Sequence, residues 1–185
     1  MKDYVVYNDI HIGSLYELPM SFEKDAIYNG DIYDLSGCLN SHVHRLEGQM
    51  RVLDDFAMDR YIHGNHECSR RSLTDYFIDE KVIFVHGHTL TWSKKKVKKW
   101  SRKEKGKGKT YRRVSMWFNG LRRLKKISLK DKTLEKAWEL ARRHGCNTVV
   151  CGHKHSRANV EELITRKGST VRVIFLPRGR NEIRV

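Results

Sequence analysis

Five short segments of the chain carry acidic, amide and imidazole side chains, which together suit a divalent metal ion. In chain order they are Asp9-Ile10-His11, Gly30-Asp31-Ile32-Tyr33-Asp34, Gly64-Asn65-His66-Glu67, His86-Gly87-His88 and Gly152-His153-Lys154-His155. These ligand types favour borderline cations such as Mn, Fe, Ni or Zn. One such segment alone is weak evidence, because short motifs of this kind also occur in ordinary turns. Five of them in one chain of 185 residues predict a metal centre.

Each segment follows a short run of β-branched or aromatic residues that predicts a buried strand. The predicted strands are residues 4–7, 26–28, 61–62, 82–85 and 148–151. In layered α/β folds, ligands bind in the crevice beyond the carboxyl ends of the strands. Strands that all deliver ligands at that end therefore predict a single pocket.

The five segments resemble the pattern of the calcineurin-like metallophosphoesterase superfamily, which is D-x-H, G-D-x-x-D, G-N-H-D/E, H and G-H-x-H. The resemblance extends from Asp9 to His155. It implies an α/β fold, a two-sheet sandwich flanked by helices, that holds two divalent metal ions. It implies that one ion is bound by Asp9, His11, Asp31 and His155. It implies that the other is bound by Asp31, Asn65, His86 and His153, with Asp31 as the bridge. Manganese is the expected metal, and Fe, Ni, Zn or Mg are alternatives.

Two metal ions of this kind suit hydrolysis at phosphorus. Cations roughly 3.5–4 Å apart lower the pKa of a bridging water and neutralise the phosphoryl oxygens. The resulting hydroxide attacks phosphorus in line, and the departing oxygen then needs a proton. The resemblance implies that His66 supplies this proton as general acid and that Asp34 orients its imidazole. We therefore expect cleavage of a phosphodiester or phosphoanhydride, in a nucleotide or nucleic acid.

Residues 93–126 form a strongly basic segment between the fourth and fifth motifs. The basic segment contains sixteen Lys or Arg and one acid, so its net charge of +15 equals that of the whole chain. Such a field attracts polyanions, and the aromatic residues within it are of the kind that stack on nucleic-acid bases. A solvated loop or a contact with an anionic membrane is the alternative explanation.

The second half of the basic segment is predicted to be helical. An apolar stripe recurs there at steps of three and four residues, at Val114, Trp117, Phe118, Leu121 and Leu124. Such a helix would cover the site as a lid, lie on a membrane surface or mediate a homodimer.

Further candidates for substrate contacts lie near the motifs or within the basic segment. They are His88, Arg70, Arg71, Arg112 and Arg113. His88 follows the predicted ligand His86 closely, so it either touches the substrate or only satisfies a loop.

Two other functions remain open. The pyrophosphatases that cleave UDP-diacylglucosamine at membrane surfaces share the overall plan, but they usually carry arginine at the position of His66 and need an insert that holds acyl chains. A non-enzymatic module would bind nucleic acid through the basic segment and use its metals for structure alone. A phosphoprotein phosphatase is disfavoured, because that subgroup has arginine where Leu35 follows Asp34.

The whole chain, residues 1–185, is predicted to form one domain, in which the basic segment is an insert or lid. Helices are expected at residues 43–56 and 128–144, the second with Ser128 as its N-cap and Gly145 as its stop. Residues 160–165 and 170–176 predict a hairpin around Lys167-Gly168, and residues 182–185 a short final strand.

No apolar run approaches the length of a transmembrane segment. No charged and apolar leader precedes the first predicted strand. A cytoplasmic protein is therefore expected.

Overall fold

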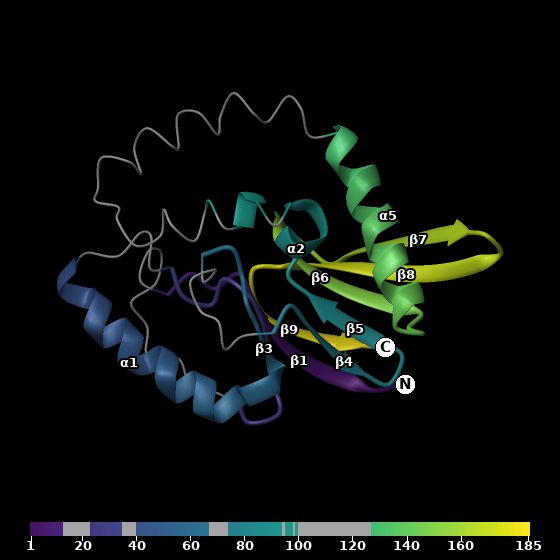
Figure 1. The fold of residues 1–185 in the computed structure, drawn as a ribbon. Helices are drawn as coiled ribbons and strands as arrows, with labels where there is room; N and C mark the ends of the chain where they lie inside the picture. Colours follow the sequence, from purple (N-terminus) through teal and green to yellow (C-terminus); the bar gives the residue numbers. More distant parts are fainter. Residues whose placement is uncertain (13–22, 35–39, 67–73, 94, 98, 100–126) are drawn as a thin grey trace.

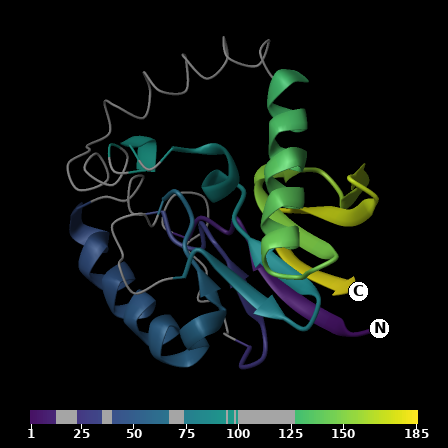
Figure 2. The same cartoon turned by 45° about the vertical axis from the view of Figure 1, so that its right-hand side comes forward.

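The computed structural model describes residues 1–12, 23–34, 40–66, 74–93, 95–97, 99 and 127–185. Two β-sheets lie face to face, and a long helix covers the outer side of each sheet (Figure 1, Figure 2). This α/β sandwich confirms the predicted fold class.

The first sheet is mixed and supplies three of the predicted ligand strands. Its strand order is β3 (Tyr61–Ile62), β2 (Ile27–Asn29), β1 (Asp3–Asn8) and β9 (Gly179–Arg184). The first three strands are parallel, so their carboxyl ends share one edge of the sheet, while β9 runs antiparallel to β1.

The second sheet is also mixed and supplies the other two ligand strands. Its strand order is β4 (Tyr76–Asp79), β5 (Val82–Val85), β6 (Thr148–Ser156), β8 (Ser169–Pro177) and β7 (Val160–Arg166). The central strands β5, β6 and β8 are parallel, and the edge strands β4 and β7 run antiparallel to their neighbours.

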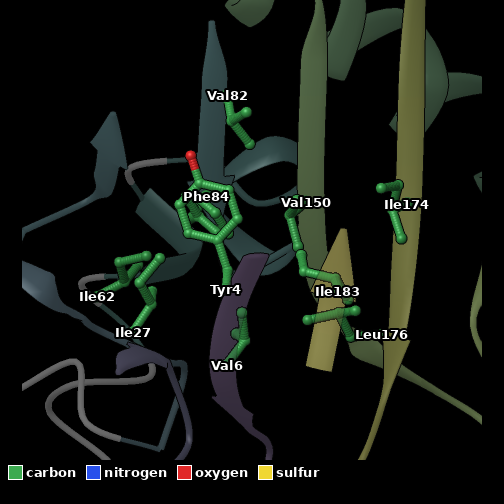
Figure 3. Packing of buried hydrophobic residues seen from close by; sticks show 10 residues of the cluster. All are labelled: Tyr4, Val6, Ile27, Ile62, Val82, Phe84, Val150, Ile174, Leu176 and Ile183. Carbon is green, nitrogen blue, oxygen red and sulfur yellow. The ribbon is translucent and has the colours of Figure 1, made fainter. Parts of the chain in front are cut away.

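The main core lies between the two sheets (Figure 3). Successive residues of a strand point to opposite faces, so Tyr4 and Val6 of β1 face the second sheet while Tyr7 faces the outer helix. Tyr4 contacts Phe84 of β5 edge-on, with ring centres 5.0 Å apart. This packing holds β1 and β5, and the ligand loops that follow them, in one position.

Two long helices complete the layers. Helix α1 (Asn40–Ala57) packs Leu53 and Ala57, one turn apart, against the outer face of the first sheet. Helix α5 (Ile127–Arg143) packs Ala137 and Ala141 in the same way against the second sheet. The 3-10 helix η2 (Met58–Arg60) and the short helix α2 (His88–Thr91) lie in connections. None of the described helices is long and apolar enough to cross a membrane.

Most predicted elements are confirmed. The five ligand strands, both helices, the hairpin and the final strand are present, and Gly145 ends α5 with a φ of +68°. The N-cap prediction is wrong, because the helix already includes Ile127 ahead of Ser128. Strand β4 and helix α2 were not predicted. Residues 95–97 and 99 are helical, whereas the apolar stripe at 114–124 lies outside the described residues.

Candidate metal centre

The predicted ligand loops meet at the carboxyl ends of the strands. Carboxylate oxygens and imidazole nitrogens of four residues lie within 4.8 Å of one another, and these residues are Asp9, Asp31, His86 and His153. A second group, formed by His11, Asp34 and His66, meets the same criterion. We call these the first and second clusters. The sequence predicted a single pocket, and the structure shows that strands from both sheets contribute to it.

Asp31 connects the two clusters. Its Oδ1 atom accepts a 2.7 Å hydrogen bond from the backbone N–H of His66. Its Oδ2 atom lies 3.4 Å from Nε2 of His86 and 4.0 Å from Nε2 of His11. One oxygen therefore anchors the carboxylate to a neighbouring loop, and the other faces the imidazoles.

The two carboxylate oxygens of Asp9 also have different surroundings. Its Oδ2 atom accepts hydrogen bonds of 2.8 Å from the backbone N–H of His153 and from the side-chain amide of Asn8. Its Oδ1 atom lies 3.9 Å from Nε2 of His86 and 3.9 Å from Nε2 of His11. These separations are too long for hydrogen bonds. The facing atoms thus lie close together without hydrogen bonds between them, as atoms that could share a metal ion would.

The backbone of the ligand loops is strained. Asp9, His11, Asp31 and His153 all have positive φ angles, of 50°, 57°, 50° and 72°. A left-handed conformation costs a residue with a side chain on the order of 1–3 kcal/mol, and such strain concentrates at functional sites. The backbone N–H of His11 donates to the Asp31 carbonyl at 2.9 Å, which helps to hold the first two loops together.

His86 presents a defined nitrogen to the first cluster. Its Nδ1 atom lies 2.9 Å from the backbone carbonyl of Asn29 and donates to it. This bond leaves Nε2 unprotonated toward the cluster in the neutral ring, the arrangement that a metal ligand requires.

Sequence reasoning missed Asn8 and Asn29, which hydrogen-bond to two predicted ligands. Asn8 donates to the Asp9 carboxylate, and the Asn29 carbonyl accepts from His86. Both are fully buried and each occupies the last position of its strand, directly before a motif. A polar residue at the end of an otherwise apolar buried strand was the available signal.

The donor set fits divalent cations. Asp9, Asp31, Asn65 and His86 are at most 4% exposed. Among the described residues, Oδ1 of Asn65 and Nε2 of His86 have no hydrogen-bond partner. Buried charges and polar atoms are costly unless they are paired or coordinate a metal. Carboxylate, amide and imidazole donors in this setting are consistent with a site for two metal ions.

Burial and mutual attraction shift the pKa values in the metal-free protein. Burial alone opposes the charged forms, but the surrounding imidazoles of His86, His66 and His11 hold the pKa of Asp31 well below its usual value. In the same way, the carboxylates of Asp31 and Asp9 outweigh burial and raise the pKa of His86 from 6.5 to about 9. This raised pKa favours the protonated form of His86 at neutral pH, so a metal that bound Nε2 would have to displace a proton.

His66 lies at the second cluster with Asp34. Its Nδ1 atom is 2.8 Å from Oδ1 of Asp34. Its ring contacts that of His11 edge-on, with centres 4.8 Å apart. The His66 side chain is 22% exposed, compared with 4% for His11 and none for His86. Of these three histidines, His66 is therefore the one most exposed to solvent.

The remaining predicted site residues are only partly described. His155 lies in β6, but its side chain is outside the described residues, and so are Arg70, Arg71, Arg112 and Arg113. His88 is fully buried. Its ring contacts those of His63, His86 and Trp92. This position favours a packing role for His88 over a substrate contact.

Comparison with known proteins places this geometry in context. The family model for calcineurin-like phosphoesterase matches residues 3–157. The chain is also similar to the structure of vacuolar protein sorting 29 from Cryptosporidium parvum, with 14% identity and a TM-score of 0.37, over 96% of this chain and 73% of that one. No match was found among curated proteins.

The backbone at Gly64 packs closely against Asp31. Substitution of Gly64 tests whether this close packing positions the Asp31 carboxylate. A Cβ atom at Gly64 would collide with the carboxylate and the backbone nitrogen of Asp31. We expect Gly64→Ala to weaken metal binding by about 10- to 100-fold, the usual effect of disturbing the support of a ligand. The measurement is isothermal titration calorimetry with Mn²⁺.

Gly48→Ala is the matched control. Nothing lies within 4 Å of a Cβ atom there. Because Gly48 lies within helix α1, alanine should stabilise the fold by about 0.5–1 kcal/mol and leave metal affinity unchanged. Wild-type affinity in Gly64→Ala would contradict the proposed positioning.

Metal binding is expected to depend on pH because the pKa of His86 is raised. Below about pH 9 the metal must displace the His86 proton. Apparent affinity for Mn²⁺ should therefore increase at least about tenfold per unit between about pH 6 and about pH 8. Calorimetry in two buffers with different ionisation enthalpies would measure the released proton. An affinity that is constant over this range, with no buffer effect, would show that His86 is not a ligand.

Proposed function

The chain belongs to the calcineurin-like phosphoesterase family, and from this premise we propose that it is a two-metal phosphohydrolase. The bond cleaved is a phosphodiester or phosphoanhydride, in a nucleotide or nucleic acid. The basic segment supports this substrate class, since a net charge of +15 within 34 residues attracts polyanions.

The buried donors of the two clusters and their neighbours would hold the metal ions. They are Asp9, His11, Asp31, Asn65, His86, His153 and His155. When bound, the ions lower the pKa of a coordinated water and neutralise charge on the phosphoryl oxygens. We propose manganese as the metal, with Fe, Ni, Zn or Mg as alternatives, since metal identity follows availability as well as ligand type.

The pairing of His66 with Asp34 is the observation that carries the proposal. The Asp34 carboxylate accepts a hydrogen bond from Nδ1–H of His66 and would stabilise the imidazolium. The Nε2 proton then remains for the departing oxygen of the substrate. The backbone N–H of His66 also donates to Asp31, so the acid and the metal ligands hold a fixed relative position. A metal site that served structure alone would not need a partly exposed, carboxylate-oriented histidine at its edge.

Replacement of His66 separates catalysis from metal binding. His66→Ala keeps the backbone bond to Asp31 and removes only the imidazole. We expect kcat to fall by about 10²- to 10⁴-fold, the usual contribution of a general acid, while metal content stays at the wild-type level. Activity assays paired with elemental analysis provide the measurement.

Asp31→Asn is the contrasting variant, because it should lose both metal and turnover. Loss of metal in His66→Ala would show that His66 is a ligand, and the general-acid role would then be wrong.

Hydrolysis of model substrates tests the reaction class. Metal-stripped protein, with Mn, Ni, Mg or Zn added back, is assayed with bis-p-nitrophenyl phosphate and with p-nitrophenyl phosphate. We expect metal-restored cleavage of the diester. If protein that binds two ions hydrolysed neither substrate with any of these metals, this result would contradict the expectation and favour a binding module. Detergent-dependent activity on a UDP-lipid, with none on nucleotide diesters, would instead favour the membrane-surface pyrophosphatase.

A further inference from the structure

Trp92 forms part of the wall beside the metal centre. It directly follows helix α2, and its backbone N–H donates to the His88 carbonyl at 2.8 Å. Its indole contacts the ring of His153 edge-on, with centres 5.9 Å apart and an interplanar angle of 87°. It contacts the ring of His88 similarly, at 5.5 Å and 78°. Since His153 belongs to the first cluster, Trp92 is in direct contact with one of the predicted metal ligands.

Lys96 is held over Trp92. The backbone N–H of Lys96 lies within hydrogen-bond distance of both the hydroxyl and the carbonyl of Ser93, at 3.2 and 2.9 Å. This turn brings the Lys96 ammonium back over the indole, where Nζ lies 3.8 Å from the ring centre. An ammonium in this position is attracted by the negative face of the ring. The Lys96 ammonium, near the start of the basic segment, is therefore held beside the metal centre by its contact with Trp92.

Neighbouring lysines differ from Lys96. Lys95, Lys96 and Lys99 are all exposed on the same short helical segment. Neither Lys95 nor Lys99 forms an ion pair or a ring contact with another described residue. Among the described lysines of the basic segment, Lys96 is the one whose ammonium contacts a ring beside the metal centre.

The position of this charge indicates what it would bind. The phosphate being cleaved would occupy the metal centre itself. A lysine ammonium is a compact point charge that binds phosphate oxygens well. Lys96 contacts Trp92, and Trp92 in turn contacts His153. The ammonium thus lies next to the centre without being one of its predicted ligands, and there it would meet a different anionic group of the same substrate.

We propose that Lys96, positioned by Trp92, binds a second phosphate group of the substrate. This inference rests on the proposed function and narrows its substrate class to molecules with more than one phosphate. Two sources share this chemistry: the adjoining phosphate of a phosphoanhydride and the next phosphate along a polynucleotide.

Binding measurements test the proposal without requiring turnover. Manganese-loaded protein is titrated by calorimetry with thymidine 5′-monophosphate and with thymidine 3′,5′-bisphosphate, which differ by one phosphate. Thymidine 5′-diphosphate represents the anhydride. We expect at least one of the two-phosphate ligands to bind about tenfold tighter than the monophosphate, the effect of one charge-assisted hydrogen bond. The tighter of the two identifies the source of the second phosphate.

Variants test whether Lys96 and Trp92 cause the preference for two phosphate groups. Lys96→Ala should reduce the preference to about twofold or less, and Trp92→Leu should weaken it because the ammonium loses its support. Lys95→Ala is the matched control and should retain it in full.

Equal affinities in the wild-type protein, or a preference that survives Lys96→Ala, would overturn the proposal. Lys96-dependent binding to phosphatidylserine vesicles without any two-phosphate preference would assign the pair to a membrane surface and also overturn it. A two-phosphate preference in a protein that hydrolyses nothing would support this site while the proposed enzymatic activity failed.

Discussion

The centre depends on how two buried carboxylates use their oxygens. Asp9 and Asp31 each commit one oxygen to a backbone N–H from a distant motif, that of His153 or of His66. The other oxygen of each faces the imidazoles of His11 and His86. Each carboxylate therefore links two loops and still has an oxygen placed where it could bind a metal. Removing either carboxylate would separate loops as well as remove a donor.

This arrangement makes the centre a junction between the two sheets. Asp9 and Asp31 follow strands of the first sheet, whereas His86 and His153 belong to the second. Strained backbone at four of these positions and the burial of several polar atoms both oppose folding. A metal that binds only the folded state offsets these costs by mass action. Metal occupancy and the stability of the sandwich should thus be linked.

Sequence patterns could predict the strands and helices that depend on hydrophobic periodicity, and the candidate ligands that depend on side-chain type. Buried strands such as Val82–Val85 are continuous apolar runs, and the ligand residues follow them directly. The carbonyl of Asn29 could not be predicted as a partner of His86, because every residue has a carbonyl and only the fold selects one. Strand β4 is half-buried and helix α2 has four residues, so neither has a strong pattern. The contact of Lys96 with Trp92 depends on a local turn at Ser93, and a run of lysines gives no sequence signal for such a turn.

The proposed function requires that these residues hold two metal ions side by side. Anomalous diffraction from crystals of the manganese-loaded protein, recorded at the manganese edge, tests this requirement most directly. We expect two peaks roughly 3.5–4 Å apart, with Asp31 between them and His86 and His11 beside them. A single peak, or peaks at exposed histidines away from Asp9 and Asp31, would contradict it.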